Sequence, residues 1–366
     1  MKSTRRSLLL GAAICATWFA TAAQPALAAD LEKLRALIPV RLIDEAFSPF
    51  VVAKHMGYFE AEGLDVELLA AGGSNEVAIQ IAAGNGDVGA ASPGQALIGM
   101  QSGFNMPVQY YYNLYYQNIW SISVLPESPI KSVTELKGKK LGVASLGSAG
   151  LTFGRAFLAK AGLNPDSDAN FLAIGAGAQA MTSLRQGAVD AMVFWDAALA
   201  KFEVNGMKTR DLPVDPDLLT LPDVSLIVQP DRLKAKAKQL EGFARAVSKG
   251  YDFTMANPAA AVAITWKYYP AARPKAETPA AAMEEGIKVN QRRMAIWSSP
   301  KTNGQNGLFI EEDWMRLVDF MIQQRLMTEK VKPTRIFTNE MIPAINKYDR
   351  AALIASAKTV DPASIK

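Results

Sequence analysis

Cysteine is almost absent from this 366-residue chain, in which Cys15 is the single example. Histidine is equally scarce, and His55 has no second histidine or cysteine at the spacing of a metal site. Beyond Cys15, the chain therefore has no thiol nucleophile and no disulfide, and a Ser-His pair would require His55 in the site. We expect neither a metal ion nor a cofactor.

Long apolar runs are also missing, except near the N-terminus. Three basic residues (Lys2, Arg5, Arg6) precede an uncharged apolar run at 8–23, and residues 26–28 read Ala-Leu-Ala. This pattern predicts a secretory signal peptide over residues 1–28, because the run is too short for a membrane anchor and no charge cluster follows it. Residues 4–9 also fit a twin-arginine signal, so both export routes stay open. We expect a soluble periplasmic chain from Ala29 onward, without Cys15.

Neither positive nor negative charge is in large excess. The whole chain has 39 Lys and Arg against 35 Asp and Glu. Removing the signal takes away three of the basic residues and leaves the charges almost balanced. Nothing in this balance indicates a nucleic acid or an anionic membrane as a partner.

The glycine-rich stretch at 138–150, GKKLGVASLGSAG, lacks what a nucleotide site needs. Its glycines at 142 and 147 have P-loop spacing, but Ser148 and Ala149 stand where Lys and Ser or Thr are required. Gly147 and Gly150 supply only the second half of a dinucleotide-binding fingerprint. A polar loop before a helix remains, and it is either tolerant of an anion or simply a tight turn.

Two stretches of the chain resemble each other, at 73–97 and at 176–199. In each, a Gly-rich turn opens an amphipathic helix, a glycine ends the helix, and an aspartate (Asp87, Asp190) precedes a short apolar strand. This order is typical of α/β proteins with a parallel sheet. The alternative is a chance likeness between two α/β units.

The remaining elements follow the same alternation. We expect strands at 40–43, 64–69, 141–144 and 224–228, and a strand at 120–124 that joins the two halves. After residue 228 the pattern is helical, with helices at 239–256, 258–268, 279–294 and 311–327.

Ligands of open α/β sheets bind beyond the carboxyl ends of the strands, so two facing domains would line one cleft. We expect one wall to hold Asp44, Glu45, Ser48, Gly73, Ser74, Asn75 and Ser92, and the opposite wall Ser145, Gly147, Ser148, Gln179, Trp195 and Asp196. Ser92 and Trp195 occupy matching places in the two similar stretches. Tyr112, within an aromatic run at 110–120, is a further candidate for ligand contact, with a place in the core as its alternative.

Three motifs resemble a known family. The segments MGYFEAEGLDVELLAAGGSNEVAIQIAAGNGDVGAASPG, IKSVTELKGKKLGV and LRQGAVDAMVFWDAAL are similar to periplasmic solute-binding proteins of nitrate/sulfonate/taurine-type ABC importers, and to the related thiamine-pyrimidine synthase family. The resemblance implies an α/β type II periplasmic binding protein fold with a ligand cleft between two lobes. Lobe 1 would span 37–122, completed by helices in 229–345, and lobe 2 would span 123–228.

The resemblance also implies a function. The protein would capture a small organic solute and deliver it to an ABC transporter permease in the inner membrane, acting as a monomer. An alternative is a protein that binds a thiamine-pyrimidine precursor. A pyrimidine-synthase-like enzyme is less favoured, because that enzyme uses a histidine where Phe47 stands here, and a Cys-rich stretch that is missing. We therefore expect no enzymatic activity.

The charge of the solute stays open. Hydroxyls and helix N-termini suit an anion, whereas Asp44, Glu45 and Asp196 would repel one unless they point away. A zwitterion or a cationic heteroaromatic compound is the alternative.

Overall fold

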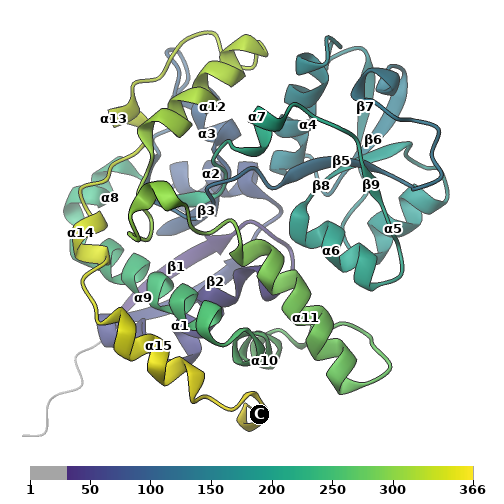
Figure 1. Ribbon diagram of the computed structural model, residues 1–366. Coiled ribbons are helices and arrows are strands. Elements are labelled where there is room, and N and C mark those ends of the chain that lie inside the picture. Colours follow the sequence, from purple (N-terminus) through teal and green to yellow (C-terminus); the bar gives the residue numbers. More distant parts are fainter. Residues whose placement is uncertain (1–30, 366) are drawn as a thin grey trace, which may run out of the picture. The chain divides into compact units, whose positions relative to one another are not determined.

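The computed structural model describes residues 31–365, so the expected signal peptide and Cys15 lie outside the described residues (Figure 1). The first sheet has the order β2-β1-β3-β10-β4. Strands β1 and β2 pair in parallel, as do β1 and β3, and β10 pairs antiparallel with both β3 and β4. Its strands are β1 (Glu32–Ile38), β2 (Leu64–Ala70), β3 (Val88–Ala91), β4 (Gln109–Asn113) and β10 (Ser225–Val228).

The second sheet has the order β7-β6-β8-β5-β9 and the same pattern of directions. Strand β6 pairs in parallel with β7 and β8, and β5 pairs antiparallel with β8 and β9. Its strands are β5 (Trp120–Val124), β6 (Lys139–Val143), β7 (Ala169–Ala173), β8 (Ala191–Trp195) and β9 (Arg210–Asp211). The α/β class expected from the sequence is thus confirmed.

Helices connect and cover these strands (Figure 1). Those nearest the sheets are α1 (Ser48–His55), α2 (Ser74–Ala82), α3 (Pro93–Gly99), α4 (Ala149–Lys160), α5 (Ala178–Arg185) and α6 (Asp196–Val204). The others are α7 (Pro216–Leu219), α8 (Pro230–Ala235), α9 (Ala237–Ala256), α10 (Pro258–Tyr268), α11 (Pro279–Met294), α12 (Glu311–Gln323), α13 (Pro333–Ile336), α14 (Ile342–Ile345) and α15 (Arg350–Lys358). None of the described helices is both long and apolar enough to cross a bilayer.

The two similar stretches occupy equivalent places. Asp87 accepts a hydrogen bond from the backbone N–H of Arg35 and returns one from its own N–H to the Arg35 carbonyl. Asp190 makes the same reciprocal pair with Lys140. Each aspartate therefore fixes the start of the central strand, β3 or β8, against its parallel neighbour. This shared geometry favours a true structural repeat over chance likeness.

The first strand differs from the expectation. Residues 40–43 form a loop, and the strand is β1 (Glu32–Ile38), which ends directly before Pro39. Proline has no N–H to donate to a ladder, so the strand stops there. The expected strand at 40–43 is thus wrong, and its residues lie on the loop that follows β1.

Two strands pair in a different sheet from the one that the expected lobe boundaries imply. Strand β10, within the expected 123–228 lobe, pairs in the first sheet between β3 and β4. Strand β5 begins at Trp120, inside the expected 37–122 lobe, and belongs to the second sheet. Strand pairing is a long-range contact, so nearness along the chain did not reveal it. The division into lobes itself remains a prediction.

The C-terminal helices return to both sheets. Helix α9 packs on α1, where Phe59 and Phe243 stack with ring centroids 5.2 Å apart. Helix α11 packs instead against α6, which follows the central strand of the second sheet (Figure 1). The segment after residue 228 thus connects elements of both halves.

Candidate functional site: a cavity between the two sheets

A cavity of about 640 Å³ lies where loops from both sheets meet. Its wall includes the loops after β1, β2, β6 and β7, together with Trp195 at the end of β8. These are the carboxyl ends of parallel strands, where open α/β sheets bind ligands. We call this space the inter-sheet cavity.

Several helices begin at the wall of the inter-sheet cavity. The residues that precede α2, α4, α5 and α6 (Gly73, Ser148, Gly177 and Trp195) all line it. The first N–H groups of a helix lack intrahelical partners and carry partial positive charge. The hydroxyl of Ser148 accepts one of them, the N–H of Gly150, at 3.1 Å. These helix starts contribute partial positive charge to the wall, which the first-turn acids Glu76 of α2 and Asp196 of α6 oppose.

Part of the expected set of ligand-binding residues lies at this wall. Those that line the inter-sheet cavity are Asp44, Gly73, Ser74, Ser145, Ser148, Gln179 and Trp195. The structure does not place Glu45, Ser48, Asn75, Ser92, Tyr112, Gly147 or Asp196 among the lining residues.

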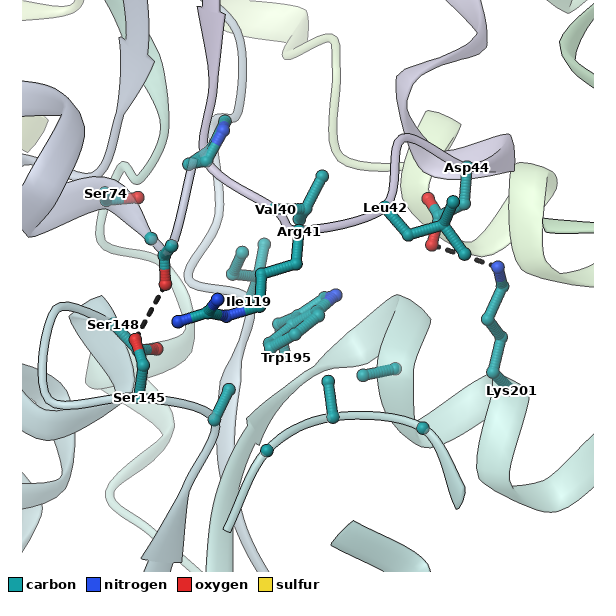
Figure 2. A pocket seen from close by; sticks show the side chains of 18 of the residues that line it. Val40, Arg41, Leu42, Asp44, Ser74, Ile119, Ser145, Ser148, Trp195 and Lys201 are labelled. Carbon is teal, nitrogen blue, oxygen red and sulfur yellow. Dashed lines mark hydrogen bonds and ion pairs between the residues drawn. The ribbon is translucent and has the colours of Figure 1, made fainter. Parts of the chain in front are cut away.

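Asn75 and Gly147 lie instead in a contact between the two halves. The N–H of Asn75 donates to the Gly147 carbonyl at 3.1 Å, and its side chain donates to the Ser148 carbonyl at 3.4 Å. Nearby, the Ser145 hydroxyl donates to the Gly72 carbonyl at 2.7 Å (Figure 2). Gly73 has a φ of 149°, and a Cβ there would lie 2.5 Å from the Gly147 carbonyl oxygen. Glycine is therefore required where the two loops meet.

Asp44 and Glu45 share one cation. The ammonium group of Lys201, on α6, lies 3.0 Å from Asp44 and 2.9 Å from Glu45. Glu45 is fully buried and also accepts a hydrogen bond from the Trp266 indole at 2.5 Å. Burial raises the pKa of Glu45, while the charge of Lys201 acts to lower it. Burial alone would lower the pKa of Lys201, but the two carboxylates outweigh it and raise that pKa.

Asp196 is also paired with a cation. It accepts hydrogen bonds from the guanidinium of Arg293, which is on α11 and only 1% exposed. The guanidinium lies over the ring of Tyr115, 4.5 Å from its centroid. Burial acts to lower the pKa of Arg293, yet Asp196 raises it overall, so this arginine stays charged.

Ser92 lies behind the wall rather than on it. It is fully buried and accepts a hydrogen bond from the Ser74 hydroxyl at 3.3 Å. Its hydroxyl also acts to lower the pKa of Asp223, although burial dominates and raises that pKa to about 7. Ser48 and Tyr112 bond to Thr265 and Ser248, respectively, at 2.9 Å and 2.8 Å in the core. The other tyrosines of the run behave similarly, because Tyr110, Tyr111 and Tyr115 are fully buried.

The apolar part of the wall is largely aromatic. Trp195 meets Trp120 edge to face with ring centroids 5.9 Å apart, and stacks on Phe194 at 5.5 Å. Ile119, Phe47 and Phe202 also line the inter-sheet cavity. Trp195 keeps part of its surface exposed, whereas Trp120 is 5% exposed. The wall therefore offers a flat apolar surface.

Sequence reasoning missed three residues that matter here, Arg41, Lys201 and Arg293, whereas Trp120 lies in the aromatic run at 110–120 that was considered for ligand contact. Arg41 was assigned to a strand that does not exist, although the Pro39 before it was a usable signal. Lys201 and Arg293 carried no local signal, because each is defined by a partner more than ninety positions away, Asp44 and Asp196. Arg41 and Trp195 both line the inter-sheet cavity (Figure 2).

His55 lies on α1 and does not line the inter-sheet cavity. Its Nδ1 is 3.4 Å from the Tyr268 hydroxyl, and partial burial lowers its pKa. Within residues 31–365, no three His, Cys, Asp or Glu side chains gather in a way that could hold a metal ion.

Comparisons with known proteins agree with this geometry. A family model described as "NMT1/THI5 like" matches residues 44–261. The riboflavin-binding protein RibY of Chloroflexus aurantiacus is 25% identical over 319 residues, which cover 81% of this chain and 82% of that protein.

Solved structures show the fold. The alkanesulfonate-binding protein SsuA from Xanthomonas axonopodis pv. citri, bound to MOPS, superposes with a TM-score of 0.60 at 18% identity, covering 85% of this chain and 97% of that one. The desulfurization enzyme DSZB superposes with a TM-score of 0.52 at 13% identity, covering 86% and 98%. The expected type II periplasmic binding protein fold is thus confirmed. Because an enzyme shares it, the fold alone does not decide between binding and catalysis.

Proposed function

The chain belongs to the NMT1/THI5-like family, and from that premise we propose that it is the extracytoplasmic solute-binding component of an ABC importer. It captures a small organic solute in the inter-sheet cavity and delivers it to a permease in the inner membrane. It acts as a monomer in the periplasm, after removal of residues 1–28. The observation that carries this proposal is a cavity of about 640 Å³ with walls from both sheets.

The size and lining of the inter-sheet cavity support the capture of an organic solute. Pockets of roughly 300–1,000 Å³ hold molecules of drug size, mostly through apolar contacts with a few polar groups. Here Trp120 and Trp195 supply apolar surface, and Ser145 and Ser148 supply hydroxyls. The names of the relatives point the same way, since one binds riboflavin and another an alkanesulfonate.

The contacts across the inter-sheet cavity support capture by closure. On one flank, Ser145 and Asn75 join the loops of the two halves by hydrogen bonds to backbone carbonyls. On the other flank, Lys201 and Arg293 join the halves by ion pairs. A solute between the walls gains contacts from both halves only when they are together, so it favours the closed arrangement.

Binding without turnover is the reading we favour over catalysis. The acids near the inter-sheet cavity are engaged by Lys201 and Arg293 rather than free for proton transfer. The place of the synthase's histidine is taken by Phe47, and His55 is elsewhere. A thiamine-pyrimidine precursor remains one specific solute within this proposal.

Identification of the natural solute tests the proposal. Protein purified gently from the periplasm should release one small organic compound on denaturation, detected by mass spectrometry. That compound should rebind to solute-free protein, raise its melting temperature, and come back intact after hours of incubation. Trp195→Ala protein, prepared in parallel, should release much less of it. Steady conversion of the compound to a product would instead assign the protein to the enzymes of this fold.

The intact mass of the secreted protein tests its processing. We expect a chain that begins at Ala29. An unprocessed chain retained in the cytoplasm contradicts a role in solute uptake.

A further inference from the structure

The carboxylates near the inter-sheet cavity have partners already. Asp44 and Glu45 share Lys201, and Asp196 holds Arg293. A carboxylate that is paired with a cation repels an anion far less than a free one, because the two opposite charges largely cancel at a distance. Because one lysine serves two acids, the group of Asp44, Glu45 and Lys201 has one acid more than its cation, whereas the Asp196–Arg293 pair is balanced. Acidic side chains therefore repel an anion less than their number suggests.

Arg41 is a cation of this wall that forms no ion pair with the described residues. It lines the inter-sheet cavity and takes part in none of the ion pairs or side-chain hydrogen bonds found within residues 31–365. The carboxylate of Glu76 lies close by and accepts the Gly72 N–H at 3.1 Å. A Cβ at Gly72 would contact that carboxylate and lie 3.5 Å from the Arg41 guanidinium, so the two charges are neighbours that form no ion pair. Figure 2 shows the guanidinium of Arg41 extending toward the loop of Ser145 and Ser148.

Two helix starts lie on the same wall as Arg41. The loop that it faces leads into α4, with Ser148 at its N-cap, and Gly73 precedes α2 on the adjacent part of the wall. The carbonyl of Gly72, an acceptor nearby, is already bonded to the Ser145 hydroxyl. Partial positive charge at the two helix starts adds to the full charge of Arg41. An anion that enters here meets the guanidinium of Arg41 and the two helix starts on the same wall.

Trp195 lines the same cavity as Arg41 and favours a particular shape for the rest of the solute (Figure 2). Together with Trp120 and Ile119 it forms an apolar part of the wall. Flat apolar bodies bind best to such surfaces, through offset stacking or edge contacts.

We infer that the solute is an aromatic or similarly flat organic anion, whose carboxylate or sulfonate group binds Arg41 and whose apolar body covers Trp195. The inference rests on the proposed function and specifies its substrate class. Arg41 is the residue that selects for negative charge. Lys201 and Arg293 join the two walls through their ion pairs. Arg41 is then the cation that binds the charged group of the solute.

A panel of matched probes tests the preference for charge. Aromatic carboxylic and sulfonic acids of one to three rings are compared with their uncharged amides and with amines of the same shape. Calorimetry and thermal shift are recorded on solute-free protein at low and high salt. We expect at least one acid to bind about 10- to 100-fold more tightly than its amide, since a hydrogen bond to a charged group is worth that much. Binding of that acid should weaken as salt rises.

A matched pair of variants assigns the preference to Arg41. Arg41→Gln should lose the advantage of the acid over its amide while it still binds the amide. Arg292→Gln removes the same charge from an exposed position on α11 outside the inter-sheet cavity, and should keep the advantage. Arg41→Lys should keep part of it, because the charge remains but the fork of donors is lost.

The outcomes separate the inference from the proposed function. If no acid binds, if an amide or amine binds more tightly, or if Arg41→Gln keeps the preference, the inference is overturned. An uncharged natural solute recovered intact from the protein would overturn it as well, while the proposed function stands. Failure of the proposed function looks different, since it appears as no recovered solute or as a converted one.

Discussion

The helices that follow the two central strands, α3 after β3 and α6 after β8, contact the opposite half in different ways. Helix α3 has no charged residue, and its Gly94 packs so closely on Thr152 of α4 that a Cβ would lie 2.7 Å from the threonine methyl group. Helix α6 instead carries Asp196 and Lys201, which form ion pairs with Arg293 and with Asp44 and Glu45. Two equivalent elements thus make an apolar contact on one side and an ionic contact on the other.

This difference follows from what each helix faces. Ser92, the residue before α3, is fully buried and bonds to Ser74, so it lies behind the wall. Trp195, before α6, opens onto the inter-sheet cavity, and α6 forms part of the wall through Lys201. A wall beside a polar solute can hold charges that stay partly hydrated, whereas a dry helix contact cannot. The two halves therefore share a backbone arrangement, whereas the side chains of α3 and α6 differ according to what each helix packs against.

Removing the cation of the more buried ion pair should have the largest effect. Arg293→Leu leaves Asp196 without its partner beside the buried Asp223, and we expect a loss of about 3–5 kcal/mol in unfolding free energy. Urea denaturation of the solute-free protein measures it. Arg292→Leu, one residue away and exposed, is the control and should change little. Equal losses for both variants would mean that the ion pair adds nothing specific.

The buried acid behind Ser92 should make stability depend on pH. Burial raises the pKa of Asp223 from 3.8 to about 7, so the folded state holds its proton where the unfolded state has lost it. Its contribution is fully present below about pH 4 and declines as the pH rises toward 7, by a few kcal/mol in all. Asp223→Asn should flatten this decline in melting temperature and raise stability at pH 7.5. Glu45, whose pKa is also raised, has the same sign. If Asp223→Asn leaves the dependence of melting temperature on pH unchanged, the decline in stability comes from Glu45 or another group.

Trp195 and Ser92 occupy matching places in the two similar stretches, but only Trp195 lies at the wall. Their substitutions should therefore have different effects on solute binding. Trp195→Ala should weaken solute binding by about 2 kcal/mol or more, because a large aromatic contact is lost. Ser92→Ala should lower the melting temperature without solute, since Ser74 and Asp223 lose a partner, and should keep the solute-induced shift. Thermal shift with the identified solute gives both values. His55→Ala, remote from the wall, should leave the shift alone, and a loss of binding there would contradict the placement of the site.

The two reciprocal aspartates should give the smallest and most similar effects. Asp87→Asn and Asp190→Asn each replace a charged acceptor of a strand N–H by a neutral one. We expect losses of about 1 kcal/mol for Asp190, which is the more exposed of the two. The loss at Asp87 should be somewhat larger, because it also pairs with Arg232 at 2.6 Å. Chemical denaturation of both variants tests whether the two aspartates also make similar contributions to the free energy of unfolding.

Much of the fold could be predicted from the chain alone. The glycine that ends a helix and the aspartate three residues later correctly placed β3 and β8, and three C-terminal helices were found within a few residues of their bounds. The strand expected at 40–43 failed because its apolar residues line a cavity rather than a sheet. Apolar residues at a binding wall and in a strand look alike in sequence.

About half of the candidate site could be predicted, and the reason lies in distance along the chain. The sequence by itself determined the α/β alternation, the repeat and the polar loops at strand ends, because turns, caps and periodicity depend on neighbouring residues. Only the tertiary structure decided which of those polar groups face the inter-sheet cavity. Lys201 lies far from Asp44 along the chain and Arg293 far from Asp196, and folding brings each pair together. These distant partners offset part of the acidic charge, while Arg41 forms no ion pair within the part of the chain that the structure describes, so the distribution of charge at this site is a property of the folded chain alone.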